Sequence, residues 1–205
     1  METPATKSEA TFAAIVDTAL TMAAAEGIGK LSLGEVAKRM NISKSGVFSR
    51  VGSLQSLQEA VLDEFDRRFV EAIFQPAMQQ PQGLPRLRAL MKGWIARAVL
   101  TIPRGACLYI SGAFEYDDLE EPLRERVQRG VLTFRAALRR TVIQSVEVGH
   151  LRPDTDPEQL VFEIYSLLIG LMHDTRFLRD ATATRRVQAA FDRVVATYRS
   201  LNYHD

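Results

Sequence analysis

The sequence predicts an all-α protein of about nine helices. Apolar residues recur at spacings of three and four along almost the whole chain of 205 residues, which is the periodicity of a helix with one buried face. Capping residues stand before several of these stretches, and glycine or proline follows them. Alternation with a period of two never lasts long enough to indicate a strand, and no internal repeat is visible.

The first two helices are marked by both their periodicity and their ends. Residues 8–26 carry an apolar stripe, and Gly27 ends it because glycine adopts the left-handed cap without a Cβ clash. Ser32, followed three residues later by Glu35, is a capping box that starts a second helix reaching Met40.

Two further helices follow closely. Asn41 and Ile42 interrupt the pattern, and Ser43 is placed to cap a short third helix that ends near Arg50. Ser53 is expected to cap the fourth helix, which reaches about Phe74. Its apolar stripe has steps of four: Leu57, Val61, Phe65, Phe69 and Ile73.

The remaining chain begins with a loop at 75–85, which contains three prolines and one glycine. Pro103 separates the first two helices beyond it, and Pro122 suits the first turn of a long helix that ends at Gly149. Asp156 with Pro157 marks the start of another helix. The helices expected here are 85–101, 105–115, 121–148, 157–178 and 184–201.

Composition excludes several classes of function. The net charge is +1, so any contact with nucleic acid needs a local basic patch. A single cysteine excludes an intrachain disulfide and a cysteine-built zinc site, and no metal, cofactor or catalytic constellation is legible. The first residues lack the apolar run of a signal peptide, and charges interrupt the most apolar stretch at 160–178. We therefore expect a cytoplasmic protein without a membrane span.

Residues 32–51 form a helix, a polar turn and a second short helix. Five side chains are spaced to close a small core between the two helices, with Ile42 as the buried aliphatic residue of the turn: Val36, Ala37, Ile42, Val47 and Phe48. The second helix then presents a polar set that suits DNA phosphates and base edges: Lys44, Ser45, Ser49 and Arg50.

Charge supports this interpretation. Residues 30–50 hold five basic side chains and one acidic side chain, a net charge of +4 that leaves −3 for the rest of the chain. Such asymmetry is the footprint of a phosphate-binding module. A structural helical hairpin with a solvated charged face is the alternative, because the same geometry also serves structural roles.

The first third of the chain resembles the DNA-binding domain of TetR-type transcriptional regulators. The resemblance rests on Ile15-Val16-Asp17-Thr18-Ala19, Gly27, Ser32-Leu33-x-x-Val36-Ala37, Ile42-Ser43-Lys44-x-x-Val47-Phe48 and Ser53-x-x-x-Leu57. The later helices resemble the family in number, length and order. The resemblance implies a DNA-binding domain at 1–55 and a domain for effector binding and dimerisation at 56–205.

Carried over residue by residue, the resemblance assigns phosphate contacts to Ser32 and Lys44. Phe48 stands where the family usually has tyrosine, Arg50 where histidine is common, and Leu54 where a lysine often contacts phosphate. The loss of that hydroxyl and that lysine implies fewer phosphate contacts and a shallower salt dependence of binding. The implied DNA site, in which Ser45 reads bases and Gly46 permits close approach, is Ser32, Ser43, Lys44, Ser45, Gly46, Phe48, Ser49 and Arg50.

The resemblance further implies a homodimer on a palindromic double-stranded DNA operator, formed through 157–178 and 184–201. The first of these helices is apolar on nearly every face, so it requires cover on two sides; a buried core helix in a monomer is the alternative. An unknown small-molecule effector is expected to bind among Phe69, Trp94, Tyr109, Phe114, Phe134 and Met172. Plain core packing is the alternative for these six.

We therefore expect a ligand-responsive transcriptional regulator, a repressor released from its operator by the effector, and not an enzyme. The alternative is a helical binding protein that has lost its DNA contacts, which the residues at Phe48 and Leu54 favour. Two weaker signals have simpler explanations. Gly27-x-Gly29-Lys30 lacks the spacing of a phosphate loop, and the acidic cluster that begins at Glu115 lacks the ligand series of a calcium loop.

Overall fold

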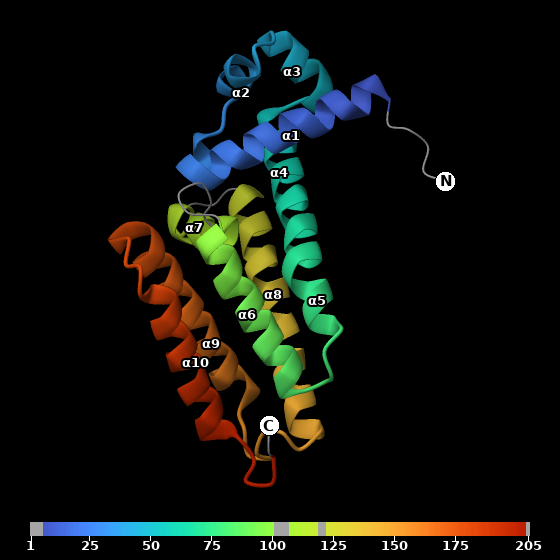
Figure 1. Cartoon of the computed structure of the whole chain (residues 1–205). Helices are drawn as coiled ribbons and strands as arrows, with labels where there is room; N and C mark the ends of the chain where they lie inside the picture. Colours follow the sequence, from blue (N-terminus) through green and yellow to red (C-terminus); the bar gives the residue numbers. More distant parts are fainter. Residues whose placement is uncertain (1–5, 101–106, 119–121, 204–205) are drawn as a thin grey trace. The chain divides into compact units, whose positions relative to one another are not determined.

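The computed structural model describes residues 6–100, 107–118 and 122–203, and these residues are helical almost throughout (Figure 1). Their one extended pairing is an isolated antiparallel bridge between Leu151 and Arg199. The expectation of an all-α fold is therefore confirmed. The predicted break between two helices at Pro103 lies outside the described residues.

The chain divides into two compact units. The first unit comprises Met1–Arg68 with Cys107–Gln128, and the second comprises Phe69–Ala106 with Arg129–Asp205. Helix α8 (Pro122–Glu147) begins in the first unit and continues in the second. The division at residues 55 and 56 expected from the sequence, between a DNA-binding domain and a domain for effector binding and dimerisation, remains a prediction.

The helices of the first unit start and end close to the predicted positions. They are α1 (Lys7–Glu26), the 3₁₀ turn η1 (Ile28–Lys30), α2 (Leu33–Met40), α3 (Lys44–Val51), α4 (Leu54–Phe69), α7 (Leu108–Glu115) and the first turns of α8.

The local caps of this unit explain that agreement. Ser43 Oγ accepts the N–H of Gly46 at 3.0 Å, and Ser53 Oγ accepts the N–H of Ser56 at 2.9 Å. Ser32 Oγ accepts the N–H of Glu35 at 3.1 Å. A capping box with both reciprocal bonds, which the sequence analysis did not identify, starts α1 at Thr6.

The small core predicted between α2 and α3 is only partly correct. Val36, Ala37 and Val47 are buried, as expected. The prediction was wrong for Ile42 and Phe48, which are 39% and 56% exposed. Val47 and Val51 lie one turn apart on the inward face of α3, so Phe48, about 100° further around the helix, faces outward.

The second unit contains one element that the sequence analysis missed. The helix of α4 continues through a π-helical turn, η2 (Val70–Phe74), into the short α5 (Gln75–Met78). The prediction of a loop from residue 75 was therefore wrong for its first four residues. The π turn lies just before Pro76 of α5, whose missing N–H removes one bond from the helical series.

The other helices of the second unit are α6 (Leu84–Leu100), the rest of α8, α9 (Pro157–Met172), the π-helical turn η3 (His173–Leu178) and α10 (Ala183–Tyr198). Asp156 caps α9 as predicted, accepting the N–H of Glu158 at 2.9 Å. Helix α10 ends three residues before the predicted end, because the chain extends to form the bridge at Arg199.

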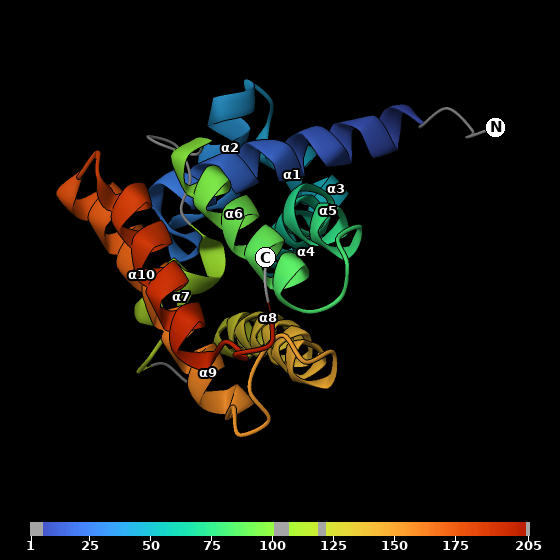
Figure 2. The same ribbon diagram turned by 60° about the horizontal axis from the view of Figure 1, so that its bottom comes forward.

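Helices α9 and α10 lie side by side, as both views show (Figures 1 and 2). Leu160, Ile164 and Leu168 of α9 are almost fully buried, and so is Phe191 of α10. This pair therefore shares a large part of the apolar core of the second unit. None of the described helices combines the length and apolar character that a bilayer crossing requires.

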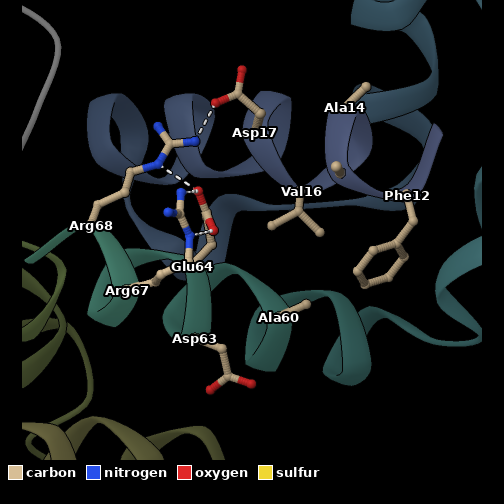
Figure 3. Close-up of a pocket in the computed structure, with 10 residues that line it drawn as sticks. Phe12, Ala14, Val16, Asp17, Ala60, Asp63, Glu64, Arg67 and Arg68 are labelled. Atoms are coloured by element: carbon tan, nitrogen blue, oxygen red, sulfur yellow. Dashed lines mark hydrogen bonds and ion pairs between the residues drawn. The ribbon is translucent and has the colours of Figure 1, made fainter. Parts of the chain in front are cut away.

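An ion-pair cluster joins α1 to α4 in the first unit. It lies at one end of a cavity of about 740 Å³, whose other end is formed by Phe12, Val16 and Ala60 (Figure 3). Arg68 donates to Asp17 and Glu64, both at 2.6 Å, and Arg67 donates to Glu64 at 2.7 Å. Arginines of α4 thus balance the charges of both carboxylates. Because Asp17 belongs to α1, the cluster holds α1 against α4.

We predict that Glu64→Gln lowers the free energy of unfolding by about 1–2 kcal/mol at pH 7. Hydrogen bonds from Arg67, supported by Arg68, lower the pKa of Glu64 from 4.5 to about 2. Because the folded pKa lies below the unfolded one, this stabilisation is complete above pH 4.5 and disappears as the pH falls towards 2.

Urea unfolding at pH 7 and pH 3 measures the effect, with Glu59→Gln as the control. Glu59 lies on the same helix, is exposed and accepts one hydrogen bond from Gln55. A Glu64→Gln deficit that is as large at pH 3 as at pH 7, or no larger than that of the control, would contradict the prediction.

Candidate nucleic-acid interface

The turn between α2 and α3 sets the geometry of the candidate interface. Asn41 ends α2 in the left-handed conformation, with φ of +55°, and its N–H donates to the carbonyls of Ala37 and Lys38. Asparagine is the residue that best tolerates this conformation after glycine. Helices α2 and α3 therefore pack against each other as a helix-turn-helix.

The amino terminus of α3 contributes backbone N–H donors to this surface. Ser43 caps it, and the N–H of Lys44 and of Ser45 lie in the first turn, where backbone donors have no partner within the helix. These donors and the positive end of the helix dipole favour a phosphate oxygen.

The basic residues of this region are mostly unpaired. Arg39 donates to Glu26 Oε1 at 3.2 Å, and its charge is thereby partly balanced. The other four are exposed and form no ion pair with any described residue: Lys30, Lys38, Lys44 and Arg50. These side chains provide the positive surface that the local net charge of +4 over residues 30–50 predicted.

The outward face of α3 is made by Lys44, Ser45, Phe48 and Ser49, all exposed. Ser45 Oγ lies 3.1 Å from Ser43 Oγ, and Ser49 Oγ donates to the carbonyl of Gly46 at 3.0 Å. The hydroxyls are therefore oriented by the helix itself. The exposed ring of Phe48 offers an apolar contact of the kind that recognises a thymine methyl group.

Gly46 and Ser32 both have structural roles in this region. A Cβ at Gly46 would lie 3.1 Å from Ser43 Oγ, so a larger residue there would require the capping hydroxyl to shift slightly. Ser32 is half-buried and uses its hydroxyl to cap α2. Leu54, where the resemblance placed a missing lysine, is 37% exposed and apolar.

Glu115 is a residue that the sequence analysis did not connect to this region. Its Oε1 accepts the N–H of Gly29 at 3.0 Å, across 86 residues of sequence. A Cβ at Gly29 would lie 2.4 Å from that oxygen and 2.5 Å from the hydroxyl of Tyr116. A larger residue at Gly29 would therefore displace the ends of the Glu115 and Tyr116 side chains, and the hydrogen bond from Gly29 ties the end of α7 to the segment that leads into α2.

A polar network ties α7 and α8 to α4 in the same unit. Tyr109 donates its hydroxyl to Asp66 at 2.5 Å, while Arg126 donates to the Tyr109 oxygen at 2.9 Å and to Asp63 and Asp66 at 2.8 Å. Burial, with the Asp66 hydrogen bond, raises the pKa of Tyr109 well above its ordinary value. The phenol therefore stays protonated and fixed.

The six residues expected to line an effector pocket are divided between the two units, with Tyr109 and Phe114 in the first and the other four in the second. Tyr109 belongs to the network of the first unit, because its buried hydroxyl needs polar partners. Phe114 is 64% exposed on α7. Met172 is buried on α9. That all six line one effector cavity remains a prediction.

Three of the six residues do meet, in the second unit. The ring centroids of Trp94 and Phe134 are 4.3 Å apart, and Phe69 lies 5.1 Å from Trp94 and 5.5 Å from Phe134. The cavity beside Trp94 and Phe134 measures about 10 Å³, which is room for about one water molecule. The aromatic cluster is closed in this conformation.

Among the residues that the structure describes, no group of three or more histidine, cysteine, aspartate or glutamate side chains is placed to hold a metal ion. His173 Nδ1 lies 3.0 Å from Asp174 Oδ1 at an exposed helix end. Cys107 is buried.

Comparison with known proteins identifies a family. The family model of the tetracyclin repressor-like C-terminal domain matches residues 83–191. A comparison with curated protein sequences finds no match.

Three solved structures share the fold along nearly their whole length. A TetR transcriptional regulator from Chloroflexus aurantiacus is 21% identical with a TM-score of 0.83, covering 95% of this chain and 98% of its own. A TetR-family regulator from Cytophaga hutchinsonii is 16% identical with a TM-score of 0.79, covering 96% and 98%. One from Streptomyces coelicolor is 18% identical with a TM-score of 0.78, covering 91% and 94%.

We predict that Lys44→Ala weakens DNA binding by a similar factor on every sequence, because a phosphate contact carries no base information. The slope of log affinity against log salt concentration should fall by about one per protomer. Gel-shift titrations at several salt concentrations measure both effects. Lys92→Ala, which removes an exposed lysine of α6, is the control. Unchanged affinity in the Lys44 variant would contradict the docking of α3.

Proposed function

The chain belongs to the TetR family of transcriptional regulators, and from this premise we propose that it is a repressor that binds a palindromic operator as a homodimer. As a member of that family it is a ligand-responsive DNA-binding regulator. It acts by binding and not by catalysis. Release of the operator by a small-molecule effector completes the proposed cycle.

The observation that carries the DNA-binding proposal is the set of unpaired cations around α3. Lys30, Lys38, Lys44 and Arg50 are exposed and form no ion pair with any described residue, while arginines elsewhere, such as Arg68 and Arg126, pair with carboxylates. Phosphates of duplex DNA are the partners that suit such a surface. A protein that had lost DNA binding would have no reason to keep these charges unbalanced.

The outward face of α9 supports the proposed homodimer. Phe162 is 57% exposed, and Ser166 and Gly170 follow it on the same face at intervals of four residues. Small residues next to an exposed aromatic ring allow the backbones of two helices to approach closely. On the neighbouring α10, Ala189 and Ala196 are also exposed. We propose that α9, η3 and α10 pair with the same elements of a second copy.

The closed aromatic cluster supports the proposed ligand response. Because the cavity beside Trp94 and Phe134 is too small for an organic ligand, an effector that binds among Phe69, Trp94 and Phe134 must separate their rings. Those side chains lie on helices α4, α6 and α8, and the network around Arg126 fixes the first part of α8 to α4 in the first unit. We propose that a change at α8 reaches the DNA-binding residues through these contacts.

We predict that the purified protein binds the DNA upstream of its own coding region at moderate salt. Substitutions of Ser45, whose hydroxyl lies on the exposed face of α3, should change which operator sequences bind best, because Ser45 faces the bases. Selection from a random DNA library, followed by gel shift, measures the preference. Failure to select any sequence would support the alternative, a helical binding protein without DNA contacts.

We predict that Phe162→Glu converts the dimer to a monomer, because it places a charge in the apolar centre of the interface. Sedimentation or light scattering at micromolar concentration measures the change. Phe114→Glu is the matched control, since Phe114 is also exposed but lies on α7. A Phe162 variant that remains dimeric would overturn the assignment of this face.

A further inference from the structure

A second cavity in the second unit combines positive charge with an apolar wall. Its volume is about 550 Å³, within the range of small-molecule sites. The apolar wall includes Phe74, Met78 and Ala137, and the polar wall includes Arg86, Arg140 and Gln144. These residues come from η2, α5, α6 and α8, which can be followed in Figure 1.

Arg86 has only weak, neutral partners. Its Nη2 donates to the carbonyls of Met78 at 3.4 Å and Gln80 at 3.2 Å, and its Nη1 donates to Gln144 Oε1 at 3.4 Å. The Nε atom is buried and has no hydrogen-bond partner. Bonds from a guanidinium to a carboxylate are much shorter, about 2.7–2.9 Å, so this half-buried cation lacks the partner that its charge requires.

Other arginines of the chain show what that partner would be. Arg39, Arg68, Arg126 and Arg186 each form an ion pair with a carboxylate. Arg86 forms none with any described residue.

Arg140 gives the cavity a second guanidinium. It lies on α8, one turn from both Ala137 and Gln144 along the face that lines the cavity. It is exposed and forms no ion pair within the described parts of the chain. None of the residues that line the cavity is acidic. Two cations therefore face one cavity with no internal counter-charge.

We propose that this cavity binds an organic carboxylate with a hydrocarbon chain. Arg86 and Arg140 hold the carboxylate, since guanidinium groups match its two oxygens, and the hydrocarbon lies against Phe74, Met78 and Ala137. Methionine adapts its shape readily to apolar ligands. An inorganic anion would satisfy the arginines but leave the apolar wall in water.

This site is separate from the aromatic cluster of Phe69, Trp94 and Phe134, and its occupation is measurable without DNA. The proposal therefore stands or falls independently of the proposed DNA binding.

Isothermal titration of the full chain with decanoate, below the concentration at which it forms micelles, tests the proposal. Decanoate should bind saturably, and decan-1-ol, which has the same chain without the charge, should bind at least about tenfold more weakly. Hexanoate should bind more weakly because it buries less hydrocarbon, and inorganic phosphate should not compete at equal concentration. Equal binding of decanoate and decan-1-ol, or displacement by phosphate, would overturn the proposal.

Substitutions locate the site. Arg140→Gln and Arg86→Gln should each weaken decanoate binding by about tenfold, and Arg129→Gln, which removes an exposed arginine of the same α8, should leave it unchanged. If Arg86→Gln destabilises the fold through its carbonyl contacts, the exposed Arg140 still decides the question. An Arg140 variant that binds decanoate as tightly as the parent chain contradicts the assignment.

Discussion

The burial of Val47 and Val51 determines how α3 is presented to the outside. Both valines are almost fully buried, with Val36 and Ala37 of α2 also in the core. A helix has one rotation about its axis that buries this pair, and in that rotation Lys44, Ser45 and Phe48 are exposed together. The proposed DNA-binding surface is thus a consequence of apolar packing on the opposite side of an eight-residue helix.

Charge compensation differs between the clusters that hold helices together and the places proposed to bind anions. Where arginines meet carboxylates, as at Arg68 with Glu64 or Arg126 with Asp66, the pairs hold helices together. Where cations lack such partners, as at Lys44 in the first unit and Arg86 in the second, the surface or cavity suits an external anion. The two kinds of site are built from the same residue types and differ in what surrounds them.

Polar side chains approach the backbone closely at two glycines, Gly29 and Gly46. In the sequence, Gly29 belongs to a weak match to a phosphate loop and Glu115 to a separate acidic cluster. In the structure, the N–H of Gly29 donates to Glu115 Oε1. A carboxylate oxygen and the Tyr116 hydroxyl occupy the place that a side chain at Gly29 would take. Gly46 likewise leaves space for the hydroxyl that caps α3.

The sequence by itself determined the all-α class, most helix ends and the basic helix-turn-helix, because caps such as Ser43 and Asp156 and the helical period act over a few residues. Only the tertiary structure decided that Phe48 is exposed, that Tyr109 belongs to a polar network and that Phe69, Trp94 and Phe134 meet without an open pocket. These outcomes depend on contacts between residues tens of positions apart, and hydrophobic spacing along one helix does not specify which partner covers each side chain.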